Sequence, residues 1–209
     1  MKIIFGTTNP RKVEDLKQII KDANLDLEVL GMHEIGWDLG EIEENGTTIE
    51  ENSLIKARAI HNFCKEHNIT YPIITDDAGL FVEELNNEPG IYTARYADDE
   101  LAQDPTLPKY QCVIKLLRNL KDKLNRSAKY RCAVTCMLSD GTYFQEVGES
   151  KGHIAEEITG ELKRPYFYSV FILDGYTKVF NDLTPEELKD TYRYQAMTKA
   201  LTNIKKYFW

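Results

Sequence analysis

Two adjacent carboxylates, Asp76 and Asp77, follow a short run of β-branched residues, Ile73 to Thr75, and precede Ala78-Gly79. Adjacent acids repel each other unless positive charge lies beside them, and hard divalent cations such as Mg²⁺ prefer oxygen ligands. Along an extended backbone the two side chains point to opposite sides, so one can hold a metal ion while the other faces a water molecule. The alternative is a plain turn that closes the strand, because Asp and Gly are frequent in turns.

A second candidate site begins where the first predicted strand ends, at Gly6-Thr7-Thr8-Asn9-Pro10. A helix N-terminus presents free N–H groups and the positive end of its dipole, so it attracts phosphate. Thr7 and Asn9 add hydrogen-bond donors, and Lys12 adds a positive charge within one turn. An ordinary helix cap by Thr8 or Asn9 is the alternative. The segment lacks the glycine pattern of a Walker loop.

Three more charged residues, Glu44, Lys56 and Arg95, could reach the Asp76-Asp77 site or a phosphate bound near it. Glu44 belongs to an acidic run before a predicted helix; such a run is usually a solvated face, but a loop carboxylate here could reach Asp76 and Asp77. Lys56 lies on a largely apolar helix, where a lysine either extends to the surface or points into a phosphate pocket. Arg95 could pair with an acid or line a polyphosphate site.

Helices alternate with strands in the first half of the chain, and a hairpin follows. A capping box at Thr48-Ile49-Glu50-Glu51 predicts a helix that runs to about His67, and Asp140-Gly141 predicts a hairpin turn. This order predicts an α/β protein with a mixed sheet. Strands are predicted over residues 2–7, 27–30, 71–75, 80–85, 129–138, 142–147 and 166–173, a loop over 31–46, and helices from Asn9-Pro10, near 113–124, near 184–187 and over 192–207.

Composition narrows the class of protein. The chain has 209 residues, 42% of them hydrophobic, and a formal net charge of −8, which argues against general attraction to nucleic acid. It holds no apolar run as long as a transmembrane helix. The four cysteines form no Cys-x-x-Cys pair, so a zinc site is poorly supported and a cytoplasmic location is expected. We expect a single domain over residues 1–209.

Four ordered motifs between residues 1 and 97 resemble those of one family, the non-canonical purine nucleoside triphosphate pyrophosphatases, also called inosine/xanthosine triphosphate pyrophosphatases. The later part of the chain resembles the family more loosely. The motifs are Thr7 with Asn9 and Lys12, the stretch Glu44 to Asn52 followed by Lys56-Ala57, Asp76-Asp77-Ala78-Gly79-Leu80, and Pro89 to Tyr96.

This resemblance implies hydrolysis of a nucleoside triphosphate between its α and β phosphates, with Mg²⁺ as the required cofactor. It implies that Glu44 and Asp76 hold the metal and that Asp77 is the general base for the attacking water. It also implies an elongated mixed β-sheet flanked by helices, two lobes with a central active-site cleft, and a homodimer. The residues expected to bind phosphates are Thr7, Asn9, Lys12 and Lys56.

The segments that read the base in this family differ here. Phe167 and Tyr168 could still stack on a base, although a packed strand and helix would explain the same tyrosine-rich segment. Arg193 matches the family, whereas Tyr192 replaces a histidine. The resemblance of the four motifs implies hydrolysis of ITP, dITP or XTP, which cleanses the nucleotide pool. The alternatives are the same reaction on another modified or pyrimidine nucleotide, and a catalytically silent nucleotide-binding protein.

Overall fold

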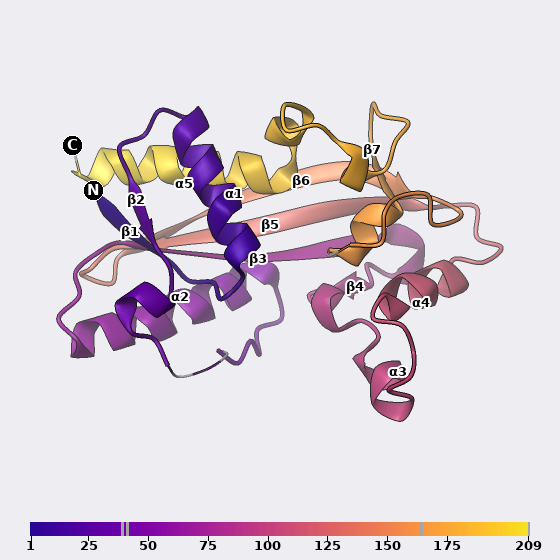
Figure 1. Cartoon of the computed structure of the whole chain (residues 1–209), viewed down its shortest axis with the longest axis horizontal. Helices are drawn as coiled ribbons and strands as arrows, with labels where there is room; N and C mark the ends of the chain where they lie inside the picture. The colour runs from indigo at the N-terminus through magenta and orange to yellow at the C-terminus, as the bar shows by residue number, and fades with distance from the viewer. Residues whose placement is uncertain (39, 41, 164, 209) are drawn as a thin grey trace. The chain divides into compact units, whose positions relative to one another are not determined.

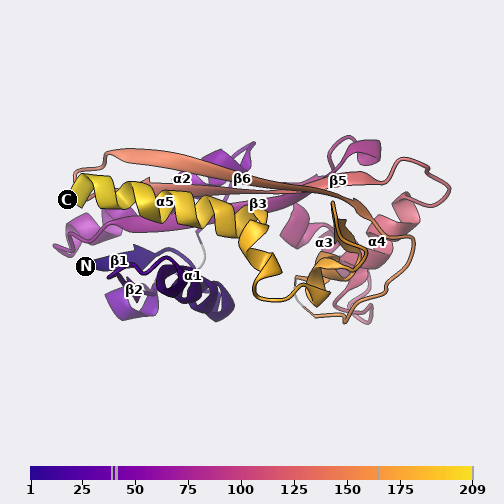
Figure 2. The same cartoon turned by 90° about the horizontal axis from the view of Figure 1, so that it is seen from above.

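The computed structural model describes residues 1–38, 40, 42–163 and 165–208, and Figures 1 and 2 show its helices and strands. The chain divides into two compact units. Unit 1 contains residues 1–77, 132–148 and the chain from 192 onward, and unit 2 contains residues 78–131 and 149–191. The expectation of one domain over residues 1–209 stays a prediction.

The sheet contains both parallel and antiparallel pairs, so the predicted mixed sheet is confirmed. In unit 1, β1 (Lys2–Phe5) pairs in parallel with β2 (Glu28–Leu30) and with β3 (Ile73–Val82). The strand order is β2-β1-β3-β5-β6-β7, and β5 (Ser127–Met137) and β6 (Tyr143–Ile154) each have residues in both units. The turn between these two strands contains Gly141 at φ +86°, as the Asp140-Gly141 pair predicts.

Three helices cover the strands of unit 1. Helix α1 (Pro10–Asp22) begins with proline at its first position, and α2 (Ile49–Glu66) begins after Thr48, as predicted. Figure 2 shows α5 (Tyr192–Phe208) running beside α1, which it contacts. The buried face of α2 packs on the strands through a core cluster that includes Ile4, Ala57, Ile60, Phe63, Cys64, Ile73 and Met137.

Unit 2 holds two short helices, α3 (Asp98–Gln103) and α4 (Gln111–Asn119). The two-residue strand β4 (Pro89–Gly90) pairs with the end of β3, and β7 (Phe171–Leu173) pairs antiparallel to β6. Its core is rich in aromatic rings. Tyr130 lies edge-on to Phe171 at 5.0 Å between ring centroids.

The structure corrects three local predictions. Strand β3 runs through Asp76 and Asp77 without a break. The strands predicted over 71–75 and 80–85 are therefore parts of one strand, and the interpretation of Asp76-Asp77 as a turn is wrong. Burial and hydrogen bonding of this central strand override the turn preference of Asp and Gly. Residues Tyr166–Ser169 form a 3₁₀ turn before β7, and the helix expected near residue 184 is a 3₁₀ turn at Glu187–Asp190.

Candidate active site

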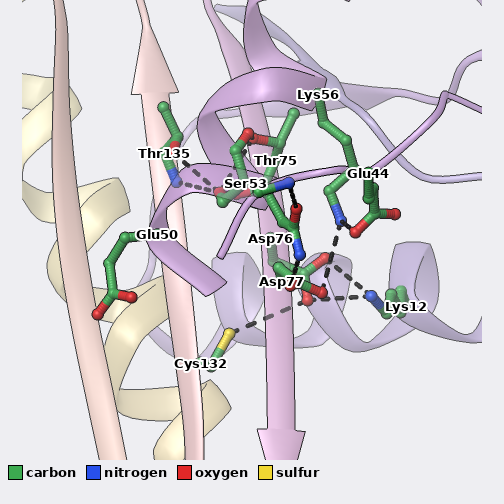
Figure 3. A network of polar contacts seen from close by, with 12 residues as sticks. Lys12, Glu44, Glu50, Ser53, Lys56, Thr75, Asp76, Asp77, Cys132 and Thr135 are labelled. Carbon is green, nitrogen blue, oxygen red and sulfur yellow. Dashed lines mark hydrogen bonds and ion pairs between the residues drawn. The ribbon is translucent and has the colours of Figure 1, made fainter. Parts of the chain in front are cut away.

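Strand β3 carries the two central carboxylates in the interior of unit 1. Because consecutive side chains of a strand point to opposite sides, Asp76 and Asp77 face different neighbours, as the sequence predicts. Asp76 is 1% exposed and the side chain of Asp77 is 17% exposed. Figure 3 shows them beside side chains from α1, α2 and the loop before α2.

Asp76 is held by two cations. Lys12 Nζ donates to both carboxylate oxygens at 3.1 Å, and an Arg193 guanidinium nitrogen donates to Oδ2 at 2.6 Å. Burial alone raises the pKa of this carboxyl, but Arg193 and Lys12 outweigh it and hold the pKa well below its usual range. Burial also lowers the pKa of the Lys12 ammonium, which Asp76 only partly offsets. Asp76 is therefore an ionised acceptor at neutral pH.

Lys56 joins the two other predicted carboxylates. Its Nζ donates to Glu44 Oε2 at 3.2 Å and lies 3.8 Å from Asp77 Oδ1. One ammonium thus gathers carboxylates from the loop before α2 and from β3, two segments far apart in the sequence. Burial is the largest cause that raises the pKa of Asp77 above its usual value. The negative charges of Glu44 and Asp76 raise this pKa further, and Lys56 lowers it only in part.

Asn52, whose part in the site sequence reasoning missed, contacts the other oxygen of Asp77. Its Nδ2 donates to Asp77 Oδ2 at 3.3 Å, and its Oδ1 accepts from the Gly46 amide at 2.9 Å. The sequence signal was available, since Asn52 ends the motif that contains Glu44. Asn52 and Asp77 are 25 residues apart in the chain, so the sequence alone did not indicate that their side chains meet.

A buried hydroxyl network fixes the first turn of α2 against the sheet (Figure 3). Ser53 Oγ lies 2.8 Å from Thr135 Oγ1 and 3.2 Å from Thr75 Oγ1, and the Thr135 amide donates to it at 3.1 Å. Thr75 in turn donates its hydroxyl to the Ser53 carbonyl at 2.7 Å. These contacts tie α2 to β3 one residue before Asp76.

Cys132 on β5 is a second neighbour of Asp76 that the sequence did not single out for the site. Its Sγ lies 4.0 Å from Asp76 Oδ2, and the residue is fully buried. Burial, together with the Asp76 charge, raises the pKa of the Cys132 thiol to about 12. The thiol is therefore protonated at neutral pH and serves as a small packing group beside the carboxylate.

A pocket of about 210 Å³ in unit 1 is lined by three of the four predicted phosphate-binding residues and by both predicted metal ligands, whereas Asn9 and Asp77 are not in its lining. Asn9 caps α1 through its side-chain oxygen, which accepts from the Arg11 amide at 3.0 Å, and its own amide donates to Thr7 at 3.2 Å. The cap interpretation of Asn9 is therefore confirmed. The pocket is lined by Gly6, Thr7, Thr8, Lys12, Met32, Gly40, Ile42, Glu44, Lys56 and Asp76.

The donor chemistry of this pocket fits a divalent cation of the magnesium type. Magnesium is usually held by one or two carboxylates, with water and substrate phosphates completing its coordination. Glu44 and Asp76 supply two carboxylates on one pocket. Within the described part of the chain, no group of three His, Cys, Asp or Glu side chains is arranged to hold a metal, so a site built from protein ligands alone is not indicated.

The residues predicted to contact the base are not among those that line this pocket. Arg193 is the partner of Asp76 described above. Phe167, in unit 2, is 3% exposed and lies 6.3 Å from the Tyr96 ring centroid. Tyr168 stacks on Phe180 with ring centroids 4.2 Å apart. Contact of Phe167, Tyr168 or Arg193 with a base stays a prediction.

The fold and the site define an α/β protein whose carboxylates and lysines surround one polar pocket. The profile of the Ham1 family matches residues 3–206. The chain belongs to the Ham1 family.

Relatives and solved structures resemble the chain over almost its whole length. A dITP/XTP pyrophosphatase of Thermoanaerobacter pseudethanolicus is 36% identical, with 99% of this chain and 98% of that protein covered. One of Clostridium perfringens is 33% identical, with 98% and 97% covered. The structure of the Staphylococcus aureus Ham1 protein has a TM-score of 0.79 at 27% identity and covers both chains completely.

Proposed function

We propose that this chain is a nucleoside triphosphate pyrophosphatase that hydrolyses ITP, dITP and XTP to the monophosphate and pyrophosphate. The observation that carries the proposal is a pocket of unit 1 whose lining includes Lys12, Glu44, Lys56 and Asp76. Relatives at 33–36% identity over almost the whole chain are named dITP/XTP pyrophosphatases. Removal of such nucleotides cleanses the pool from which nucleic acids are made.

Asp77 is the proposed general base. It takes the proton of a water that attacks the α phosphorus, while the bond from that phosphorus to the bridging oxygen breaks and pyrophosphate leaves. A base near the reacting water contributes typically about 10²- to 10⁴-fold to the rate. The contact of Asn52 with one oxygen and Lys56 near the other orient the carboxylate.

Lys12 and Lys56 bind the phosphate oxygens and offset the negative charge that builds on them during transfer. Thr7 lies at the pocket beside the N-terminus of α1, whose free amides favour an anion. Glu44 and Asp76 would hold Mg²⁺, which supplies Lewis-acid polarisation of the phosphoryl oxygens when it is bound.

A panel of triphosphates tests the reaction and the substrate together. Pyrophosphate release is measured with ITP, dITP, XTP, the four standard ribonucleotides and modified pyrimidine nucleotides, at saturating Mg²⁺ and without it. We expect the highest kcat/KM with the 6-oxo purines and no release without a divalent ion. Asp77→Asn should lower kcat about 10²-fold or more, whereas Asp26→Asn, at an exposed position, should leave it unchanged.

A different preferred nucleotide is the second candidate. The observation that favours it is Tyr192, which replaces the family's histidine and is 2% exposed. A higher kcat/KM for another nucleotide in the same panel would select it. Nucleotide binding without pyrophosphate formation at any Mg²⁺ or Mn²⁺ concentration would instead indicate a silent binding protein.

We further propose that the chain works as a homodimer in the cytoplasm. Closed two-fold dimers are the commonest oligomers, which makes this the first state to test. Light scattering of the purified chain measures it directly, and a monomer mass at micromolar concentration would reject it. No helix in the described part of the chain has the length and apolar character needed to cross a membrane.

A further inference from the structure

Asn52 lies where the loop of Glu44 meets Asp77. It occupies the first turn of α2 and is 1% exposed. Its side chain contacts both neighbours, since it accepts from the Gly46 amide at 2.9 Å and donates to Asp77 Oδ2 at 3.3 Å. A buried amide with polar contacts at both ends is fixed in one orientation.

The chemistry of the two partners decides which end of the amide faces which. The Gly46 N–H can only donate, so it requires the amide oxygen of Asn52. The ionised Asp77 carboxylate can only accept, so it requires the amide nitrogen. Neither an acid nor an alkyl side chain of the same size satisfies both partners. Only the carboxamide group does so at this length.

Gly46 shows how closely the loop approaches Asn52. A Cβ placed on Gly46 would lie 2.7 Å from Glu51 Cβ, 2.8 Å from Asn52 Oδ1 and 3.1 Å from the backbone nitrogen of Asn52. Close packing against Glu51 and Asn52 therefore requires glycine at this position, and Gly46 is not among the glycines with a positive φ. Glu44 lies two residues before Gly46 in the same loop, so the packing of Gly46 against α2 also positions Glu44.

Ser53, the next residue, anchors Asn52 to the sheet. Its hydroxyl contacts with Thr75 and Thr135 fix the first turn of α2 against β3 and β5. The helix therefore cannot slide along the strand without breaking a buried network. Asn52 projects from this fixed turn toward a carboxylate on one side and a loop amide on the other.

We propose that Asn52 is a positioning residue that aligns the Asp77 carboxylate with the loop that carries Glu44. The inference depends on the proposed function, because Asp77 is the base in that reaction. Asn52 acts through Asp77 and touches no substrate. A loss of Asn52 therefore lowers kcat and leaves the KM for the triphosphate nearly unchanged.

A double-mutant cycle tests this directly, with the best triphosphate of the panel at saturating Mg²⁺. We expect Asn52→Ala to lower kcat about tenfold or more, because misplacement by about 1 Å can cost 10²-fold, with KM within about threefold. In the Asp77→Asn background the same change should cost less than about threefold, because the group that Asn52 aligns is then gone. Asn45→Ala, an exposed asparagine of the same loop, should leave kcat unchanged.

Equal fold losses in both backgrounds would overturn the proposal, as would an effect of Asn45→Ala as large as that of Asn52→Ala. Asn52→Asp is the second variant, because it retains the acceptor for Gly46 and removes the donor to Asp77. We expect it to fold and to lose kcat at least as severely as Asn52→Ala. Full kcat in a folded Asn52→Asp protein would reject the role.

A readout without substrate separates this inference from the proposed function. The denaturant midpoint is measured for the wild type, Asn52→Ala, Asp77→Asn and the double variant, all in EDTA. We expect a smaller midpoint shift from Asn52→Ala in the Asp77→Asn background than in the wild type. Additive shifts reject the contact whether or not any triphosphate is hydrolysed, whereas a wild type that hydrolyses none rejects the proposed function alone.

Discussion

Arg193→Met tests how strongly the buried Asp76 carboxylate depends on its cationic partners. Asp76 is 1% exposed, and Arg193 donates to its Oδ2 at 2.6 Å. A hydrogen bond to a charged group contributes about 1.5–3 kcal/mol. The larger loss of about 3–5 kcal/mol for a buried charge without any partner does not apply, because Lys12 still donates to both oxygens. We expect the free energy of unfolding to fall by about 2–3 kcal/mol.

Urea denaturation monitored by circular dichroism measures this change. The slope with denaturant should stay constant, so that the shift in midpoint reports stability alone. Lys199→Met, at an exposed position on the same helix α5, is the matched control and should change stability by less than about 0.5 kcal/mol. A change for Arg193→Met as small as that of the control would refute the argument.

The pH dependence of the same variant has a definite sign. Arg193 and Lys12 hold the pKa of Asp76 below its ordinary value of 3.8. Asp76 therefore contributes stability that is present above pH 3.8 and is lost as the pH falls through the lower pKa of the folded state. Removal of Arg193 raises the folded-state pKa, so Arg193→Met should begin acid unfolding at a higher pH than the wild type. An unchanged acid midpoint contradicts this.

Gly46→Ala places a methyl group 2.7 Å from Glu51 Cβ and 2.8 Å from Asn52 Oδ1, so the loop must shift and kcat should fall about tenfold or more. Full kcat would show that the loop shifts without disturbing the site. Ser53→Ala leaves buried partners without their hydroxyl and should lower the free energy of unfolding by about 1–3 kcal/mol, and a loss under about 0.5 kcal/mol would count against the network. The hydrogen bond from Arg118 lowers the pKa of Glu100 below 4.5. Glu100 therefore stabilises the fold above pH 4.5, and Glu100→Gln should make stability less dependent on pH below that value; an unchanged pH profile of the unfolding midpoint argues against it.

The sequence predicted much of unit 1 because its local signals agree with its packing. Thr48 caps α2 as expected, since the Glu51 amide donates to its hydroxyl at 3.1 Å. Even so, the Glu51 carboxylate accepts from the Thr47 amide at 2.6 Å, a pairing one residue away from the capping-box pattern. The spacing of Asn9 and Pro10 likewise predicted the start of α1. A helix cap depends on residues that are close together in the chain, so it can be predicted from the sequence.

Strand β3 shows why other features were not predictable. Asp76-Asp77-Ala78-Gly79 has the composition of a turn, yet it lies inside a ten-residue strand. The cations that make this tolerable come from α1 and α5, which are distant in sequence. The partners of Asn52 and Ser53 are equally remote, and no single segment reveals them. The sequence predicted that a loop carboxylate could reach Asp76 and Asp77, but it gave no sign of the contacts that Asn52 and Ser53 make.

The residues proposed for catalysis and those predicted to contact the base lie in different surroundings. Lys12, Glu44, Lys56 and Asp76 line one pocket within unit 1. Phe167 instead is an interior residue of unit 2, and Tyr192 is interior to unit 1. Neither ring is in the lining of this pocket. The reaction and the preferred base are therefore separable properties of this chain, and kcat/KM across the triphosphate panel measures them separately.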